Sequence, residues 1–266
     1  MPELVGKGPR KHIMFFEPGG HRIELICHAF RVPSSAAKHS QKETRLMAKI
    51  ADARTILRGL AALSGQYPAF VVADAADNPT DQFSDWLDVA INAGVPEPHA
   101  MTLSTVDSQG CPDARVLLLK DLDEGGWYFA ANSLSPKGKQ IQRHADVALS
   151  FYWPKIGRQV RVKGQAIDLG PERGAEDFRA RSLGSRATAL VGHQSEILRD
   201  PTELDAQFQA QLQRLTDSPS IVEHAWAVYV VRAREVEFWQ GAADRRHLRL
   251  RYLHNRSEWS KALLWP

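Results

Sequence analysis

The chain has 266 residues, of which 43% are hydrophobic and 24% charged, with a net charge of +3, as expected of a globular protein with one large domain or two small ones. No run of the sequence approaches the roughly 18 consecutive apolar residues that a membrane-spanning helix needs. The first twenty residues lack the apolar core of a signal peptide. The mild net charge gives no argument for nucleic-acid binding. The two cysteines, Cys27 and Cys111, are far apart and in no metal-ligand spacing, so we expect a cytoplasmic protein without disulfides.

Residues 11–26, KHIMFFEPGGHRIELI, predict a β-hairpin around a Pro-Gly-Gly turn. This segment resembles the closing hairpin of the glyoxalase/vicinal-oxygen-chelate family, in which the acidic residue matching Glu24 can be a metal ligand. Such a module needs more strands to close its sheet, and no histidine cluster accompanies Glu24 at a suitable spacing. We therefore interpret residues 1–32 as an orphan hairpin, either a fusion remnant or an over-extended start, and expect no metal site. A working metal site at Glu24 is the alternative.

Residues 33–78 are expected to form a helical linker segment, in which a polar stretch precedes a capping box that begins at Ser40 and opens a helix. A second helix is expected to begin after the N-cap Asn78 and to stop at Gly94. The apolar side chains of this second helix form one stripe that predicts core packing, and they are Phe83, Trp86, Leu87, Ala90 and Ile91.

The hydrophobic period changes from 3.6 to 2 near residue 100. Helices are expected at 135–144 and over most of 171–215, with stops at Gly184 and Gly192 and a last helix opening at Asp200. Antiparallel strands with helices inserted between them suit a mainly β fold, a closed or split β-barrel with flanking helices, rather than a parallel doubly wound sheet. No Gly-rich phosphate loop of the Rossmann or P-loop type is present. The expected strands are 100–107, 114–123, 127–132, 147–153, 159–169, 225–239 and 245–254.

Arg245, His247 and Arg249 alternate along the last expected strand, so they would project from the same face. Two fixed cations and an imidazole on one face repel one another unless an anion lies among them. An anion-binding site is one interpretation of this triplet, and a solvated basic edge strand is the other.

Three further basic clusters lie on or beside the expected strands. Arg115 and Lys120 would point to opposite faces of one strand, and the apolar residues between them predict burial on both faces. Lys137 stands at the start of a helix, where backbone N–H groups and lysines form a phosphate seat, although lysines at such positions are ordinarily solvated. Gln159 and Arg161 share one face of a later strand.

Neutral donors and one aromatic residue accompany these cations. Gln159, Gln194 and Ser195 offer hydrogen bonds, and Trp239 ends a strand just before the basic triplet, where it either walls a flat ring or packs in the core. Cations for a phosphate, amides for ring heteroatoms and an aromatic wall together suit a phosphorylated aromatic ligand.

Seven motifs, in order, resemble those of the pyridoxamine/pyridoxine 5'-phosphate oxidase family: HAMTLSTVD, ARVLLLK, GRQVRVKG, HQSEI, EFWQG, RRHLRLRY and the closing Trp259…Leu264-Trp265-Pro266. The resemblance covers residues 79–266. It implies an antiparallel, FMN-binding split β-barrel that forms a homodimer with FMN at the subunit interface. It also implies a small phosphorylated pyridine as substrate and O2 as electron acceptor, with no nucleic-acid or membrane partner.

The resemblance also implies roles for individual residues. Arg245 and His247 would be the catalytic residues. The substrate would contact Lys120, Asp177, Arg181, Ser185, Arg245 and His247. FMN would contact Arg115, Val116, Leu117, Leu118, Leu119, Lys120, Ala130, Ala131, Lys137, Gln159, Gln194, Ser195, Trp239 and Arg249.

Four positions depart from the family pattern. Ala130 and Pro136 stand where an aromatic and a basic residue are usual near FMN, Asp177 stands where a substrate-contacting Tyr is usual, and Arg246 replaces the usual Leu. The function expected first is oxidation of pyridoxamine or pyridoxine 5'-phosphate to pyridoxal 5'-phosphate. The alternatives are a related flavin oxidase acting on another aromatic ring, of the phenazine-pathway type, and a non-catalytic flavin- or haem-binding split barrel.

Asp177 matters most for the substrate, because a carboxylate beside a phosphate is unfavourable. We expect Asp177 to pair with a nearby arginine such as Arg181, which leaves the phosphate to Lys120 and Ser185. The alternative is that the natural substrate lacks the phosphate.

Overall fold

The computed structural model describes residues 13–16, 22–25 and 52–266. The chain divides into two units, Met1–Leu60 and Ala61–Pro266. In the first unit, β1 (Ile13–Phe16) and β2 (Arg22–Leu25) pair antiparallel, which confirms the two strands of the expected hairpin. Its Pro-Gly-Gly turn and the capping box at Ser40 lie outside the described residues. Residues 52–59, within the expected linker segment, are helical, and residues 60–71 are not.

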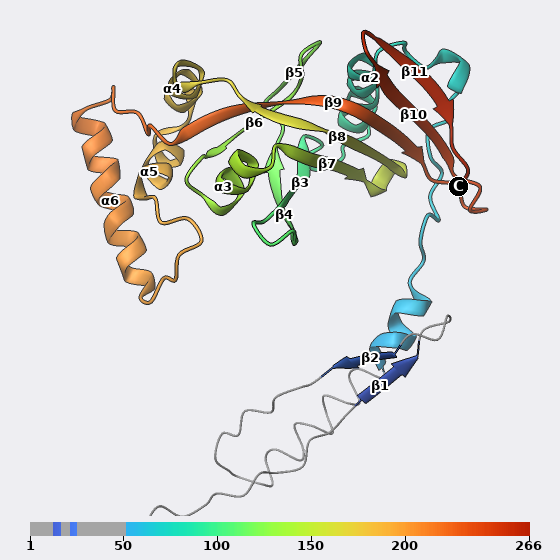
Figure 1. The fold of residues 1–266 in the computed structure, drawn as a ribbon, viewed down its shortest axis with the longest axis horizontal. Helices are drawn as coiled ribbons and strands as arrows, with labels where there is room; N and C mark the ends of the chain where they lie inside the picture. The colour runs from blue at the N-terminus through green and yellow to red at the C-terminus, as the bar shows by residue number, and fades with distance from the viewer. Residues whose placement is uncertain (1–12, 17–21, 26–51) are drawn as a thin grey trace, which may run out of the picture. The chain divides into compact units, whose positions relative to one another are not determined.

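The second unit is built on one antiparallel sheet of nine strands (Figure 1). The strand order is β11-β10-β9-β8-β7-β3-β4, while β6 pairs with β9 and β5 pairs with β6. The long strand β9 pairs with β8 along one edge and with β6 and then β10 along the other. The strands are β3 (Ala100–Val106), β4 (Pro112–Leu118), β5 (Asp121–Asp123), β6 (Gly126–Asn132), β7 (Asp146–Trp153), β8 (Arg158–Asp168), β9 (Trp226–Gln240), β10 (Leu248–Asn255) and β11 (Glu258–Leu263).

The strand β8 bends at Lys163 and Gly164, where its register against β9 shifts. A Cβ atom at Gly164 would lie 2.1 Å from the carbonyl oxygen of Arg232, so only glycine lets the two backbones approach this closely. The bulge allows β8 to stay paired with β9 along the whole of β8 while the sheet curves, as a split barrel requires.

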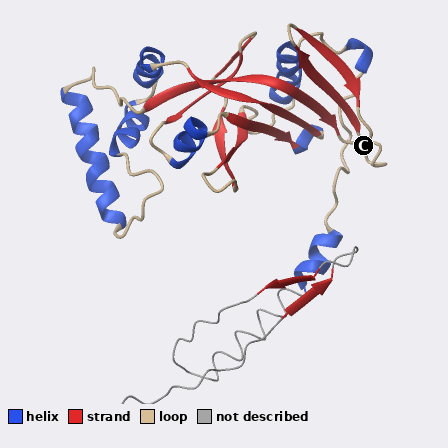
Figure 2. Cartoon of the chain, in the orientation of Figure 1, coloured by secondary structure: helices blue, strands red, loops and turns tan. Residues whose placement is uncertain are grey.

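Five helices flank the sheet (Figure 2). In Figure 1, α4, α5 and α6 gather at one end of β9, while α2 lies near β10 and β11 at the other. None of the helices in the described residues is long and apolar enough to cross a membrane. The helices are α2 (Pro79–Asn92), α3 (Pro136–Arg143), α4 (Pro171–Ala180), α5 (Leu183–Val191) and α6 (Pro201–Asp217), with short 3-10 turns η1 (Val72–Asp74) and η2 (Pro154–Ile156).

The helix boundaries agree with the expected caps at most positions. Asn78 accepts a hydrogen bond from the Thr80 N–H at 2.9 Å, as an N-cap does, and α5 ends at Gly192 as expected. The expected stop at Gly184 is wrong, because Gly184 lies inside α5. The helix break falls earlier, where Ser182 caps α5 by accepting a hydrogen bond from the backbone of Ser185.

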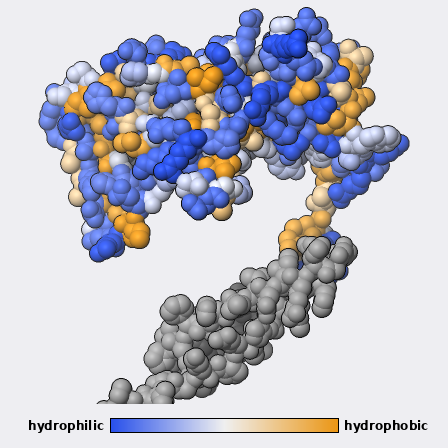
Figure 3. Space-filling view, in the orientation of Figure 1, coloured by the Kyte–Doolittle hydropathy of each residue, from blue (hydrophilic) through white to orange (hydrophobic). Residues whose placement is uncertain are grey.

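Aromatic rings join α2 to the sheet. Phe83 on α2 is fully buried, and its ring centroid lies 5.9 Å from that of Trp127, 4.7 Å from that of Phe151 and 5.9 Å from that of Trp153. Of the expected apolar stripe on α2, Ile91 alone is exposed. These ring contacts make the core a packed layer between α2 and the sheet, which gives the sites on the strands a rigid support. The visible face of the second unit is mostly hydrophilic, with hydrophobic residues in small groups (Figure 3).

Candidate active site

The first candidate binding position is the start of α3. Lys137 is only 7% exposed, and its Nζ donates to Ser135 Oγ at 3.2 Å and to Gln194 Oε1 at 3.0 Å. Ser135 caps the helix by accepting a hydrogen bond from the Gly138 N–H. A Cβ atom at Gly138 would lie 2.4 Å from the Ser133 carbonyl oxygen, so this tight turn needs glycine. The turn places a buried ammonium group beside the N-terminus of a helix.

Arg115 on β4 lies near this ammonium group. Its guanidinium donates to Thr105 Oγ1 at 2.6 Å and to Gln140 Oε1 at 3.2 Å, and it pairs with Asp113. Burial lowers the pKa of Lys137, and the positive charge of Arg115 lowers it further. No carboxylate in the described part of the chain forms an ion pair with Lys137. Two neighbouring cations, one of them buried without a counter-ion, fit an anion such as a phosphate.

A second group forms a row across three neighbouring strands. Gln159 on β8 is opposite Trp239 on β9, and Trp239 is opposite Arg249 on β10. Opposite residues of an antiparallel pair share a face, so an amide, an indole and a guanidinium lie side by side, and all three are partly exposed. Arg249 also donates from Nη1 to the Trp265 carbonyl oxygen at 2.9 Å, which ties the chain end to this row. The row fits one wall of a site for a flat ring.

Glu237 holds this row in place and was missed by the sequence reasoning. It is 3% exposed; its Oε1 accepts from Arg249 Nε at 2.8 Å, and its Oε2 pairs with Arg161. Burial by itself would raise the pKa of Glu237, but the hydrogen bonds from Arg249 and Arg161 outweigh burial and lower it. The signal in the sequence was an acidic residue in the apolar stretch EVEFW, which requires a cationic partner when buried.

The basic triplet does not lie on one strand as expected. The strand β10 begins at Leu248, and Arg245 has a φ of +67° in the turn before it, so strand alternation does not apply to Arg245 and His247. The loop nevertheless brings His247 to Trp239, with ring centroids 4.8 Å apart. His247 Nδ1 accepts a hydrogen bond from the Ala242 N–H at 3.1 Å, so the neutral ring carries its proton on Nε2.

A third group lies around Asp177 on α4. Asp177 Oδ1 pairs with Lys120 Nζ at 2.9 Å, and its Oδ2 accepts from Trp226 Nε1 at 2.8 Å. The expected pair of Asp177 with Arg181 is wrong, because the Arg181 guanidinium stacks on the Trp226 ring at 3.9 Å and donates to the Ser185 carbonyl oxygen at 3.0 Å. Trp226 begins β9, and nothing in the local pattern set it apart from a core residue.

This third group borders a cavity of about 210 Å³. No hydrogen bond or ion pair within the described part of the chain joins Lys120, Asp177, Arg181 or Ser185 to Arg245 or His247. The expected substrate residues therefore fall into two groups within one chain. The cavity is lined by Lys120, Asp121, Tyr128, Arg173, Glu176, Asp177, Ala180 and Val228.

The expected burial of both faces of the strand from Arg115 to Lys120 is wrong for the single chain. The strand β4 ends at Leu118 and is the last strand of the sheet, and Val116 is 66% and Leu118 is 46% exposed. Apolar side chains on one face of an end strand need a covering surface, which a single chain does not supply here.

The remaining expected residues take ordinary positions near these groups. Leu117 packs against the core, Leu119 is buried, and Ala130 and Ala131 pair with Val228 and Ala227 through β6 and β9. Ser195 follows Gln194 in the loop after α5 and has a φ of +74°.

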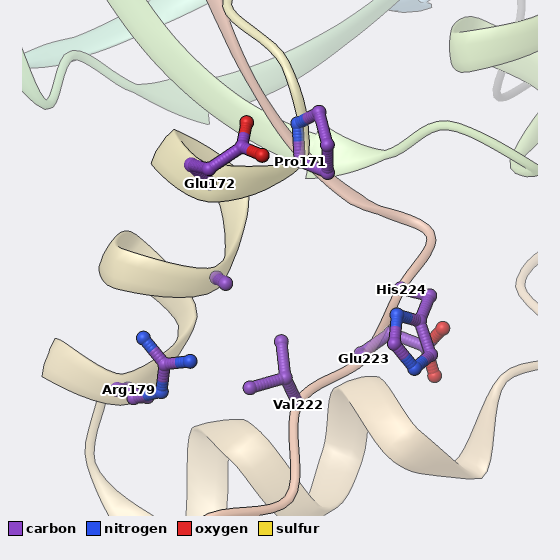
Figure 4. Close-up of a pocket in the computed structure, with 7 residues that line it drawn as sticks. Pro171, Glu172, Arg179, Val222, Glu223 and His224 are labelled. Atoms are coloured by element: carbon purple, nitrogen blue, oxygen red, sulfur yellow. The ribbon is translucent and has the colours of Figure 1, made fainter.

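A larger cavity, of about 380 Å³, lies between α4 and the segment before β9 (Figure 4). It contains none of the expected site residues, and its polar groups are those of Glu172, Arg179, Glu223 and His224. Within the parts of the chain that the structure describes, no group of three or more His, Cys, Asp or Glu side chains could hold a metal ion.

Comparisons with known proteins agree with this arrangement. A family model described as "Pyridoxamine 5'-phosphate oxidase" matches residues 87–240, and one described as "Pyridoxine 5'-phosphate oxidase C-terminal dimerisation region" matches residues 226–266. The chain is 40% identical to a pyridoxine/pyridoxamine 5'-phosphate oxidase of Thermosynechococcus vestitus over 73% of this chain and 92% of that protein. It is also 40% identical to the protein of that name in Pseudomonas fluorescens, over 73% of this chain and 91% of the relative.

Solved structures agree on the fold. PhzG from Burkholderia lata, solved with tetrahydrophenazine-1-carboxylic acid, has a TM-score of 0.71 and 29% identity over 76% of this chain and 100% of that one. A pyridoxamine 5'-phosphate oxidase-related, FMN-binding protein from Nostoc punctiforme has a TM-score of 0.57 at 16% identity, over 69% of this chain and 97% of that one. The expected split barrel is confirmed, and the chain belongs to the pyridoxamine 5'-phosphate oxidase family.

Proposed function

We propose that the protein is an FMN-dependent oxidase that converts pyridoxamine or pyridoxine 5'-phosphate to pyridoxal 5'-phosphate with O2 as electron acceptor. The observation that carries this proposal is the buried Lys137 beside Arg115, which has a neutral partner in Gln194 but no carboxylate in the described residues. A single terminal phosphate, as in FMN, supplies the missing negative charge. The family of the chain supports the same cofactor, since the pyridoxamine 5'-phosphate oxidase-related protein from Nostoc punctiforme is described as FMN-binding.

The proposed FMN site combines the first two groups. Lys137, Arg115 and Gln194 bind the phosphate, with Ser195 as a further donor. Gln159 and Trp239 address the ring, and Arg249 completes the site from β10. The other members are the backbone and side chains of Val116, Leu117, Leu118, Leu119, Lys120, Ala130 and Ala131.

We propose that two copies of the chain share each FMN. The exposed apolar face of β4, at Val116 and Leu118, needs a cover, and residues 226–266 match a dimerisation region. Sedimentation of the flavin-loaded protein is expected to give a dimer. A flavin-loaded monomer would contradict this assignment.

FMN bound at this site would supply the redox chemistry, the removal of two electrons and two protons from the C4' alcohol or amine, with O2 as the acceptor that becomes hydrogen peroxide. The protein's own part is positioning and electrostatics. Lys120, Arg181 and Ser185, with Asp177 beside them, hold the substrate at one end. Arg245 and His247 orient the amine or alcohol at C4', and the Nε2 proton of His247 is free to donate to that group because Nδ1 is occupied by Ala242.

The test is purification followed by absorbance and turnover. The proposal predicts a flavin spectrum, release of FMN on denaturation, and peroxide formation with pyridoxine 5'-phosphate. A colourless protein that takes up no FMN would refute the cofactor assignment, and a haem spectrum would indicate the non-catalytic alternative. An FMN-loaded protein that turns over no pyridoxine compound would refute the substrate assignment.

One observation favours a second candidate, an FMN oxidase that acts on another aromatic ring. Asp177 already occupies Lys120, which weakens the case for a phosphorylated substrate. The structural similarity to PhzG, solved with tetrahydrophenazine-1-carboxylic acid, makes a fused-ring compound the substrate to assay in parallel.

A further inference from the structure

The loop 241–247, which carries both proposed catalytic residues, leaves and re-enters the sheet at one residue. Gln240 ends β9, and in the sheet it is opposite Arg158 of β8 on one side and Leu248, the first residue of β10, on the other. Both ends of the loop therefore meet at Gln240, and the loop takes its position from this residue.

Every hydrogen-bonding group of the Gln240 side chain is used. The residue is 8% exposed, and its Oε1 accepts from Arg158 Nε at 2.9 Å. Its Nε2 lies 3.3 Å from the Ile156 carbonyl oxygen and 3.2 Å from that of Gly157. The Gly241 N–H donates to the same Gly157 carbonyl at 2.7 Å. The first residue of the loop is thereby bonded to the turn that precedes β8.

The hydrogen bonds continue through Ala242 to the proposed catalytic residues. The Ala242 N–H donates to His247 Nδ1 at 3.1 Å, and the Ala242 carbonyl accepts from the Arg245 N–H at 3.1 Å. Ala242 follows Gly241 directly, so a displacement of Gly241 moves the donor that orients the imidazole and the acceptor that holds the Arg245 backbone. The direction of the His247 Nε2 proton therefore depends on how the start of the loop is held.

Arg158 connects these bonds to the core. Its guanidinium carbon lies 4.3 Å from the ring centroid of Trp86 on α2, a residue that is 2% exposed, and its Nη2 donates to the Ala69 carbonyl oxygen at 3.4 Å. Arg158 precedes Gln159 on the strand, so the two side chains take opposite faces of the sheet. Arg158 thus lies on the core side, away from the face that Gln159 presents to the proposed flavin.

The Arg158 guanidinium is a costly group at this position. It is 3% exposed, its Nη1 has no hydrogen-bond partner, and no carboxylate in the described part of the chain forms an ion pair with it. Burial lowers the pKa of Arg158 to about 10, so the group is charged at neutral pH without a counter-ion. An apolar side chain avoids this cost but supplies no directed donor for Gln240 Oε1.

Resting on the proposed function, we propose that Arg158 is a positioning residue: through Gln240 it holds the loop 241–247 so that Arg245 and the Nε2 proton of His247 face the C4' group of the substrate. Arg158 itself contacts neither the substrate nor FMN. Its loss leaves the Gln240 amide free to turn and releases the start of the loop, which misplaces the two catalytic side chains while the flavin site keeps its own residues.

Hydrogen–deuterium exchange of the FMN-loaded protein tests this inference without turnover. The backbone amides of Gly241, Ala242 and Arg245 are bonded within the loop or to its base. In Arg158→Met these three amides are expected to exchange at least about tenfold faster than in the wild type, because local opening of the loop no longer breaks the bond to Gln240.

The matched control is Tyr252→Phe. It removes another buried hydrogen bond of the same core layer, from Tyr252 Oη to the Ala76 carbonyl oxygen at 2.7 Å, and leaves every bond of the loop in place. It is expected to change the exchange of the loop amides less than about threefold. Gln240→Met breaks the same connection from the other side and is expected to act like Arg158→Met, and the double variant is expected to add less than about threefold to either.

Rapid kinetics separate positioning from a general loss of structure. In Arg158→Met, reduction of bound FMN by saturating pyridoxine 5'-phosphate without oxygen is expected to slow at least about tenfold, while FMN affinity and reoxidation of the reduced flavin by O2 change less than about threefold. Unchanged loop exchange in Arg158→Met, the same acceleration in Tyr252→Phe, or unchanged flavin reduction in Arg158→Met overturns the inference. A wild-type protein whose FMN no pyridoxine compound reduces refutes the proposed function instead, and the loop amides still decide whether Arg158 positions the loop.

Discussion

Replacing Lys137 by methionine separates the cost of a buried cation from its use in binding. Methionine has a similar length and no charge, so the substitution removes a desolvated ammonium group that lacks a carboxylate partner in the described residues. The apoprotein is therefore expected to be as stable as the wild type or more stable. FMN binding is expected to weaken by about 1.5–3 kcal/mol, the range for a hydrogen bond to a charged group, which is roughly a tenfold to hundredfold rise in Kd.

The dependence on pH has a definite sign. Because the pKa of Lys137 in the folded apoprotein is lowered from 10.5, the unfolded chain binds more protons between the lowered value and 10.5. The stability of the wild-type apoprotein, relative to Lys137→Met, is therefore lowest below the folded pKa and rises with pH through that window. Bound phosphate reverses this effect, because an anion favours the charged lysine.

The assays are urea denaturation of the apoprotein between pH 7 and 10 and fluorescence titration with FMN. Lys139→Met is the matched control, since Lys139 is exposed two residues further along α3, and it is expected to change both quantities little. An apoprotein destabilised by more than about 1 kcal/mol, or an FMN affinity changed less than about threefold, would refute the reasoning.

Three other predictions follow from single features. Glu237→Gln is expected to destabilise the fold by about 1–3 kcal/mol at pH 7. Because the pKa of Glu237 is lowered in the folded state, the extra stability of the wild type is present above pH 4.5 and disappears as the pH falls through the folded pKa. Denaturation of both proteins across that pH range measures the difference. In the wild type, Arg158 Nε donates to Gln240 Oε1 at 2.9 Å, at the base of loop 241–247. Arg158→Met removes this buried donor, so a loss of about 1–3 kcal/mol in the free energy of unfolding is expected in urea denaturation. An unchanged denaturation midpoint would contradict this expectation. Deleting residues 1–32 is expected to leave FMN content and oxidase activity largely intact, as the separate unit Met1–Leu60 suggests; loss of folding on truncation would show that the hairpin is needed.

Most elements of this chain were predictable from local pattern. Residues near 100 change from helical to strand periodicity, and Asn78 and Asp200 cap the helices that follow them, because capping and alternation depend on neighbours within a few positions. The Arg245 turn shows the limit of this reasoning. A residue at positive φ breaks the alternation, and nothing in RRHLR marks where the turn ends and β10 begins.

The partners of the charged residues were decided by the tertiary structure. The sequence by itself placed Lys137 at a helix start, but its burial and its bond to Gln194, 57 positions away, depend on how the loop after α5 packs. Glu237 lies between two arginines only because β9 runs between β8 and β10 in this register. Asp177 could have met any of several cations, and packing of α4 brought it to Lys120. Local pattern reports which face a side chain takes, whereas the identity of its counter-ion depends on long-range register and packing, which a single sequence does not contain.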